Sequence, residues 1–153
     1  MPPLEVRRNL EEKIYRANRI IDYVGDYFNV NVRNKSRKRE YTMPKQIAIY
    51  LIDRYILISL SEIGKLFPTA RGYMDHSNVH FCKYKIIDVI PFDKEIKNHL
   101  NNLKEDAKEL ARLDNNEFLI YKEKQNILNL LEGLDIEEII KIRKNINIIC
   151  TVN

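Results

Sequence analysis

The stretch that decides the fold is residues 59–90, with the sequence SLSEIGKLFPTARGYMDHSNVHFCKYKIIDVI. A serine, either Ser59 or Ser61, can cap a short helix, because its hydroxyl accepts a backbone N–H from the first helical turn. Pro68 and Gly72 predict a turn after that helix. A second helix follows directly, so the stretch predicts a helix-turn-helix motif.

The second helix carries hydrogen-bonding side chains at its N-terminus. Asp75 is expected to be the N-cap, and Pro91 stops the helix after about Ile90. Its apolar stripe consists of Val79, Cys82, Ile86 and Val89. The polar side chains outside that stripe are His76, Ser77, Asn78 and His80. Side chains of this kind can read base edges in a major groove, where each base pair shows a distinct pattern of donors and acceptors.

A cluster of cations precedes the motif. Its members are Lys35, Arg37, Lys38 and Arg39. Flexible cations in a loop bind phosphates or reach into a minor groove. Residues 33–91 hold eleven basic and five acidic side chains, residues 1–32 are balanced, and residues 92–153 carry two more acidic than basic ones. The positive charge is therefore confined to the segment with the candidate reading helix, which indicates a phosphate-backbone partner.

A helix is expected between the cations and the motif. Pro44 suits the first turn of a helix, and the apolar period continues to about Tyr55. Lys45 and Gln46 would then stand in that first turn, where the helix dipole and free N–H groups favour a phosphate. They complete the predicted DNA-contacting set.

The remaining segments are also helical by pattern. Expected helices cover residues 10–28, 92–113, 117–132 and 135–145, and residues 146–152 are β-prone. With 44% apolar and 31% charged residues, the 153-residue chain can bury a core. We therefore expect an all-α protein with a helix-turn-helix domain at 1–91 and a helical extension at 92–153.

At this point the residues resemble the C-terminal DNA-binding domain (domain IV, Trp repressor-like) of DnaA, the bacterial chromosomal replication initiator. The resemblance spans roughly residues 15–90 and is carried by Arg37, Arg39, Pro44-Lys45-Gln46, Ser59-Leu60-Ser61-Glu62-Ile63-Gly64, Phe67 and Asp75-His76-Ser77-Asn78-Val79. It implies that Arg37 or Arg39 reaches the minor groove and that Lys45 and Gln46 hold the backbone. Asp75, His76 and Ser77 would then read bases.

The chain departs from the DnaA pattern at two places. Asn78 stands where the family's Asp-His-Thr-Thr-Val signature has its second Thr, which would change the preferred base. Residues 68–74 form a longer turn than the family has, and this displaces Arg71.

Other chemistry has little support in the sequence. No phosphate-binding Gly-x-x-x-x-Gly-Lys-Ser/Thr loop is present, and no residue constellation indicates catalysis, so we expect no ATPase, no enzyme and no cofactor. His76 and His80 stand one helical turn apart, but they lack a third metal ligand, so no metal site is expected. The two cysteines, Cys82 and Cys150, are expected to be buried thiols in a reducing compartment. No signal peptide or membrane span is expected.

The sequence therefore predicts a sequence-specific binder of double-stranded DNA that acts as a replication accessory factor or transcriptional regulator. It would be cytoplasmic, associated with the nucleoid, and a phage or mobile element could encode it. Residues 92–153 could bind a second copy or a replication protein. Two alternatives stay open: a protein-interaction adaptor that reuses the fold, and a non-specific DNA-packaging protein.

Overall fold

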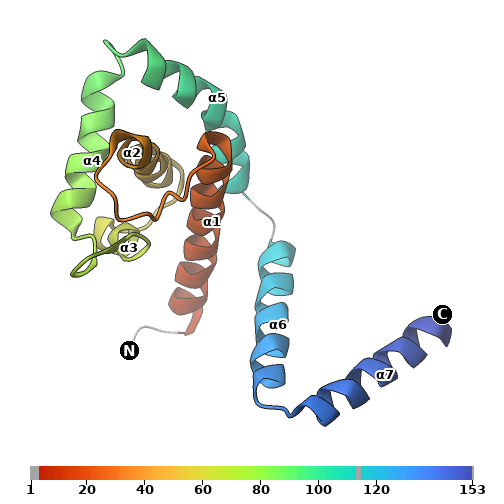
Figure 1. Cartoon of the computed structure of the whole chain (residues 1–153). Helices are drawn as coiled ribbons and strands as arrows, with labels where there is room; N and C mark the ends of the chain where they lie inside the picture. The colour runs from red at the N-terminus through yellow and green to blue at the C-terminus, as the bar shows by residue number, and fades with distance from the viewer. Residues whose placement is uncertain (1–3, 113–114, 153) are drawn as a thin grey trace. The chain divides into compact units, whose positions relative to one another are not determined.

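The computed structural model describes residues 4–112 and 115–152. Within them, seven helices and one short hairpin follow each other along the chain (Figure 1). They are α1 (Leu4–Phe28), α2 (Arg39–Tyr55), α3 (Leu60–Lys65), β1 (Pro68–Thr69), β2 (Gly72–Tyr73), α4 (His76–Val89), α5 (Lys94–Leu110), α6 (Asn115–Glu132) and α7 (Ile136–Val152). The prediction of an all-α helix-turn-helix fold with a helical extension is confirmed.

The chain forms two compact units, residues 1–113 and 114–153. Helix α5, which follows the boundary predicted at residue 91, belongs to the first unit. Its apolar stripe joins the buried core of that unit through Ile96, Leu100, Leu103 and Ala107. Its spacing predicted an amphipathic helix, but which surface would cover its apolar stripe depends on contacts distant in sequence.

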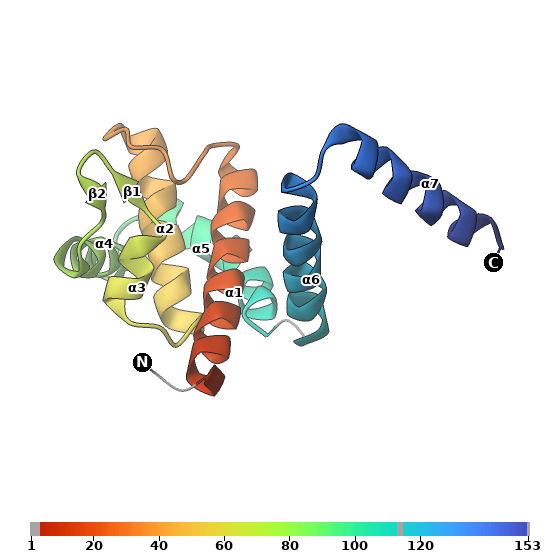
Figure 2. The same ribbon diagram turned by 90° about the horizontal axis from the view of Figure 1, so that it is seen from below.

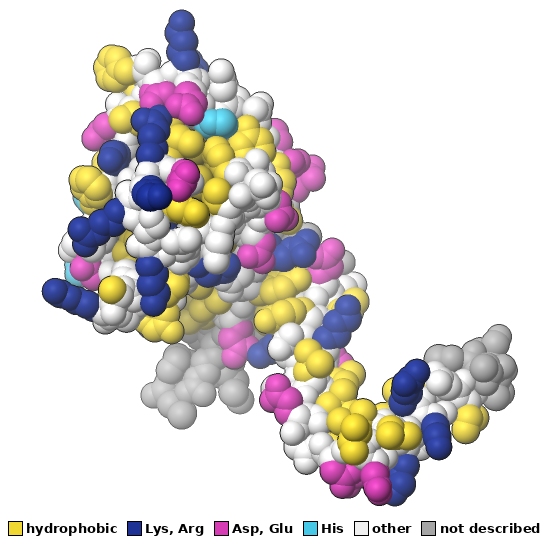
Figure 3. Space-filling view, in the orientation of Figure 1, with side chains coloured by type: hydrophobic (Ala, Val, Ile, Leu, Met, Phe, Trp, Pro, Cys, Tyr) yellow, Lys and Arg dark blue, Asp and Glu magenta, His cyan; other side chains and the backbone are white. Residues whose placement is uncertain are grey.

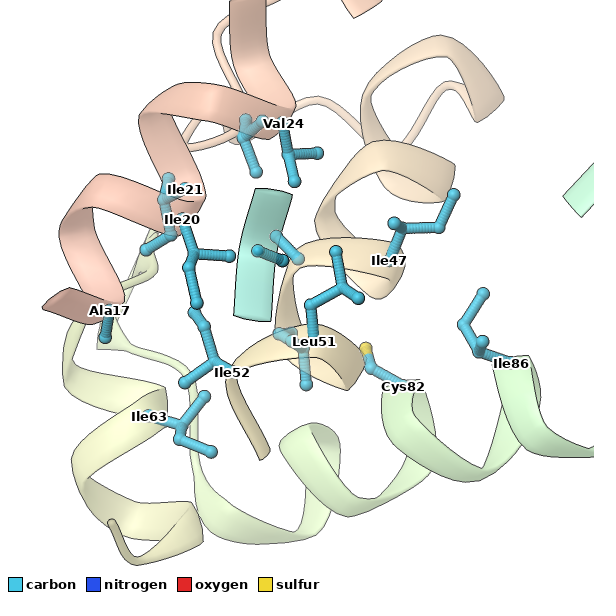
Figure 4. Packing of buried hydrophobic residues seen from close by; sticks show 14 of the residues in the cluster. Ala17, Ile20, Ile21, Val24, Ile47, Leu51, Ile52, Ile63, Cys82 and Ile86 are labelled. Atoms are coloured by element: carbon cyan, nitrogen blue, oxygen red, sulfur yellow. The ribbon is translucent and has the colours of Figure 1, made fainter. Parts of the chain in front are cut away.

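The core of the first unit is built around α2. Figure 4 shows Ile47, Leu51 and Ile52 of α2 among apolar side chains of α1, α3 and α4. Burying one Ile or Leu side chain stabilises a fold by roughly 1.5–3 kcal/mol. In α4 the buried residues are Val79, Cys82 and Ile86, three of the four in the predicted stripe, and the fourth, Val89, is partly buried against the same core. The opposite face of α4 is therefore turned to solvent. The side chain of Cys150 lies outside the described residues.

The helix-turn-helix packs closely where α3 meets the start of α4. Ser59 caps α3 in a capping box, in which Ser59 and Glu62 each bind the other's backbone N–H. A Cβ added to Gly64 would lie 2.1 Å from the carbonyl oxygen of Met74. Only glycine leaves room for the chain that leads into α4.

The turn between α3 and α4 is a small antiparallel hairpin. Pro68 pairs with Tyr73 and Thr69 with Gly72, which leaves Ala70 and Arg71 at the tip. Gly72 has a φ of 127°, a backbone conformation that other residues rarely adopt. The expected turn is thus present, with a strand pairing that its spacing did not predict.

Two expectations about helix ends are wrong. The helix expected to have Pro44 in its first turn is α2, which begins earlier, at Arg39. Pro44 therefore lies inside α2 and leaves the carbonyl of Glu40 without the usual helical donor. At the other end of the chain, α7 continues to Val152 where a β-prone segment was expected from residue 146. The isoleucines there have high strand propensity, but extending an existing helix is cooperative and outweighs that propensity.

Among the described helices, none is long and apolar enough to span a membrane.

Candidate nucleic-acid interface

The four cations ahead of the motif lie on the surface of the first unit. Lys35, Arg37 and Lys38 belong to the loop before α2, and Arg39 is the first residue of α2; all four are exposed. The carbonyl oxygen of Lys38 accepts the backbone N–H groups of Tyr41 and Thr42 at 3.0 Å. The first N–H groups of a helix have no intrahelical acceptor. The cations therefore stand at a helix end that itself attracts anions.

Lys45 and Gln46 do not lie in the first turn of α2, because the helix starts at Arg39. Lys45 is largely buried, and its ammonium donates a hydrogen bond of 2.7 Å to the carbonyl oxygen of Asn34. Burial lowers the pKa of Lys45, because the charged form is desolvated. Through this hydrogen bond, Lys45 links α2 to the cationic loop.

A groove brings the cationic loop next to the helix-turn-helix. It has a volume of about 270 Å³. Its walls come from Lys35, Ser36 and Arg37 of the loop, Thr42, Lys45 and Gln46 of α2, Pro68, Thr69 and Ala70 of the hairpin, and Met74 and Cys82. In Figure 2 the hairpin lies beside the loop that enters α2. Segments about thirty residues apart thus share one surface.

At the N-terminus of α4, Asp75 is the N-cap, as predicted. One carboxylate oxygen of Asp75 accepts the backbone N–H of Asn78 at 2.8 Å, and the other lies 3.3 Å from the Asn78 side-chain nitrogen. An Asn amide has two N–H donors and one carbonyl acceptor. After its bond to Asp75, Asn78 keeps one donor and its acceptor, the pair that adenine requires.

The other polar side chains at this end also face solvent. His76, Ser77, Asn78 and His80 are exposed. The His76 ring nitrogen lies 3.5 Å from the Ser77 hydroxyl, and the centre of the His80 ring lies 4.4 Å from the centre of the Tyr84 ring. Within the described residues, no three His, Cys, Asp or Glu side chains gather in a way that could hold a metal.

The residues predicted to contact DNA did not include two exposed residues on the face of α4 that carries Ser77. Phe81 is 60% exposed, and the Lys85 ammonium lies 5.8 Å from the centre of its ring. Ser77, Phe81 and Lys85 follow each other at four-residue steps, so the helical period that located the buried stripe also places them on one face. That period could have identified them from the sequence.

A family model described as "Bacterial dnaA protein helix-turn-helix" matches residues 17–83. This segment runs from the middle of α1 through the cationic loop and the turn into α4. Residues 17–83 are a DnaA-type helix-turn-helix. The resemblance seen in the sequence is thereby confirmed.

Curated relatives align with this DnaA-type segment and its surroundings. The chromosomal replication initiator protein DnaA of Thermus thermophilus is 34% identical over 89 residues, which is 56% of this chain and 20% of the relative. DnaA of Oenococcus oeni is 33% identical over 101 residues, 64% of this chain and 22% of the relative. DnaA of Rickettsia akari is 32% identical over 110 residues, 65% and 23% of the two chains. The chain thus spans about a fifth of the length of these relatives.

Proposed function

We propose that the chain binds double-stranded DNA sequence-specifically through the N-terminus of α4, as a replication accessory factor or transcriptional regulator. One observation carries this proposal. The polar start of α4 and the cationic loop are both exposed on the first unit, and that loop shares a groove with the turn of the DnaA-type motif. A helix end that reads bases and cations that bind phosphates need such a common surface.

Phosphate contacts are assigned to Lys35, Arg37 and Lys38. These side chains are exposed and lie ahead of the N-terminus of α2, so backbone N–H groups and side-chain charge attract the same anion. Arg39 adds to the set but is shared with α5 through an ion pair to Glu95. Lys45 is assigned a positioning role, because its ammonium already binds the Asn34 carbonyl.

Base contacts are assigned to His76, Ser77 and Asn78, with Asp75 fixing the amide of Asn78. A good bidentate contact to a base discriminates by about 1–3 kcal/mol. The bond from Asn78 to Asp75 holds the amide in one orientation, so less conformational freedom is lost when it meets a base. His80 lies one turn further along α4 and is assigned a flanking contact.

The test is a fluorescence-anisotropy titration of the full chain with duplexes selected from a random pool. Log affinity should fall with log salt by about 0.9 for each phosphate contact. Arg37→Ala should weaken all duplexes and reduce this slope by roughly 1. The matched control is Arg19→Ala, an exposed cation of α1, which should leave the slope unchanged. Failure of the random pool to converge on a motif would reject sequence-specific reading in favour of DNA packaging.

A protein-interaction adaptor is the second candidate, and one surface feature favours it. A groove of about 180 Å³ between α2 and α5 has an apolar floor that includes Leu51 and Leu100 and a rim with Arg54, Lys97 and Lys104. An acidic peptide with an apolar anchor fits this chemistry. Capture of a replication protein, with no retention of any duplex at low salt, would favour the adaptor.

A further inference from the structure

The second unit exposes an apolar surface that its own two helices leave open. Representative side chains are Ile120, Ile127 and Leu130 of α6, which are 56%, 49% and 72% exposed, and Ile136, Ile140 and Ile146 of α7, which are 74%, 47% and 53% exposed. Ile120, Ile127 and Leu130 form one stripe along α6, and Ile136 and Ile140 lie one turn apart on α7. Figure 3 shows apolar side chains along α6 and the start of α7. Patches of this kind mark interaction sites.

These helices need a covering surface to be stable. Most helical stability in proteins comes from packing of the apolar face and not from intrinsic propensity. The sequence nevertheless sets the N-terminus of α7 firmly, because Asp135 and Glu138 form a reciprocal pair of hydrogen bonds at 2.9 and 3.1 Å. A defined helix with an open apolar stripe indicates an interface and not an unstructured tail.

The charges of the second unit favour a second copy of this chain as the occupant. Residues 115–152 carry six acidic and five basic side chains, so two copies do not repel each other strongly. Glu137 in the first turn of α7 and Lys144 are seven residues apart, so they lie along one edge of the line formed by Ile136 and Ile140. An antiparallel pair of α7 helices places Glu137 of each copy beside Lys144 of the other. DNA is disfavoured as the occupant by the lack of positive excess.

We propose that α6 and α7 of two copies pack against each other as a symmetric antiparallel dimer. Two copies of α6 and α7 together supply four helices, and a four-helix arrangement buries apolar stripes of this kind. The dimer would hold two first units together. This inference does not depend on the proposed DNA binding, because self-association is measured without DNA.

A charge exchange between two variants tests the dimer directly. The full chain, studied by sedimentation equilibrium and native mass spectrometry, should be a dimer. The variants Glu137→Lys and Lys144→Glu should each weaken self-association on the order of tenfold, because like charges then meet. An equimolar mixture of the two variants should form a heterodimer and regain the affinity. Helix content by circular dichroism verifies that both variants fold.

An apolar substitution gives an independent measurement. Ile140→Glu should make the chain monomeric, whereas Leu57→Glu should not, because Leu57 is an 82% exposed apolar residue of the first unit. A monomeric wild-type chain at tens of micromolar overturns the proposal. So does a mixture of the two charge variants that stays unpaired, since a foreign partner for α7 predicts no rescue between copies of this chain.

Discussion

The guanidinium of Arg39 lies 2.9 Å from the carboxylate of Glu95, so a cation of the candidate DNA-binding surface is paired with α5. Both side chains are mostly exposed. The second carboxylate oxygen of Glu95 lies 3.9 Å from the His99 ring, whose other nitrogen lies 3.0 Å from the Tyr27 hydroxyl. Helix α5 thus contacts both α1 and the start of α2 through polar groups, in addition to its buried stripe.

Glu95→Gln should strengthen DNA binding, because Arg39 would no longer be shared with a carboxylate. An exposed ion pair stabilises by about 0–1 kcal/mol, so the gain should be at most roughly fivefold. Anisotropy titrations at low salt measure it. Glu105→Gln is the matched control, since Glu105 is an exposed carboxylate of the same helix. Equal gains from both variants would mean that only overall charge matters and that the pair with Arg39 has no specific effect.

Gly64→Ala should destabilise the helix-turn-helix. Its Cβ would lie 2.1 Å from the Met74 carbonyl oxygen, so α3 or the start of α4 has to move. Overpacking of this kind costs about 1–3 kcal/mol. Urea unfolding followed by circular dichroism measures the loss. Gly133→Ala is the comparison, because its Cβ would meet only an ordinary contact at 3.7 Å. Unchanged stability of the Gly64 variant would contradict the close approach described here.

Tyr23 predicts a stability change at alkaline pH. Burial, together with the hydrogen bond of 2.5 Å that its hydroxyl donates to Asp106, raises the pKa of Tyr23 from 10.0 to about 12. The folded state therefore holds this proton more tightly than the unfolded state. The contribution is complete below pH 10 and is lost as the pH rises from 10 to about 12.

Tyr23→Phe should accordingly flatten the loss of unfolding free energy between pH 10 and 12. Denaturant titrations at a series of pH values check this expectation. Tyr73→Phe, which changes a 66% exposed tyrosine of the hairpin, serves as the control and should keep the wild-type slope in that window. If Tyr23→Phe also keeps that slope, the hydrogen bond from Tyr23 of α1 to Asp106 of α5 does not determine the pKa of Tyr23.

The parts of the fold that sequence could predict are those set by local chemistry. The cap at Asp75 and the buried stripe from Val79 to Ile86 follow from hydrogen bonding within one turn and from the helical period. The same local argument failed for α2. Proline is favoured in a first turn, yet Pro44 lies further inside α2, and the helix tolerates one missing hydrogen bond there.

The rest depends on contacts between residues distant in sequence. The ion pair of Arg39 with Glu95 joins residues 56 positions apart, and the role of Lys45 depends on the carbonyl of Asn34. No periodicity encodes such partners. The residue types at the site were predictable, because cations and small polar side chains suit phosphates and bases. Which cations remain free for DNA could be seen only from the folded arrangement.

In the proposed complex the start of α4 reads bases while the cationic loop binds phosphates. The most direct test compares two sets of variants on a panel of duplexes that differ by single base pairs. Replacing Ser77 and Asn78 by Ala should reduce discrimination between duplexes by about 1–3 kcal/mol at one or two positions, with the salt slope unchanged. Replacing Lys35 and Arg37 by Ala should weaken all duplexes alike and flatten the salt slope. If both sets lower affinity uniformly and leave discrimination intact, α4 does not read the sequence and the proposed roles of α4 and the cationic loop are wrong.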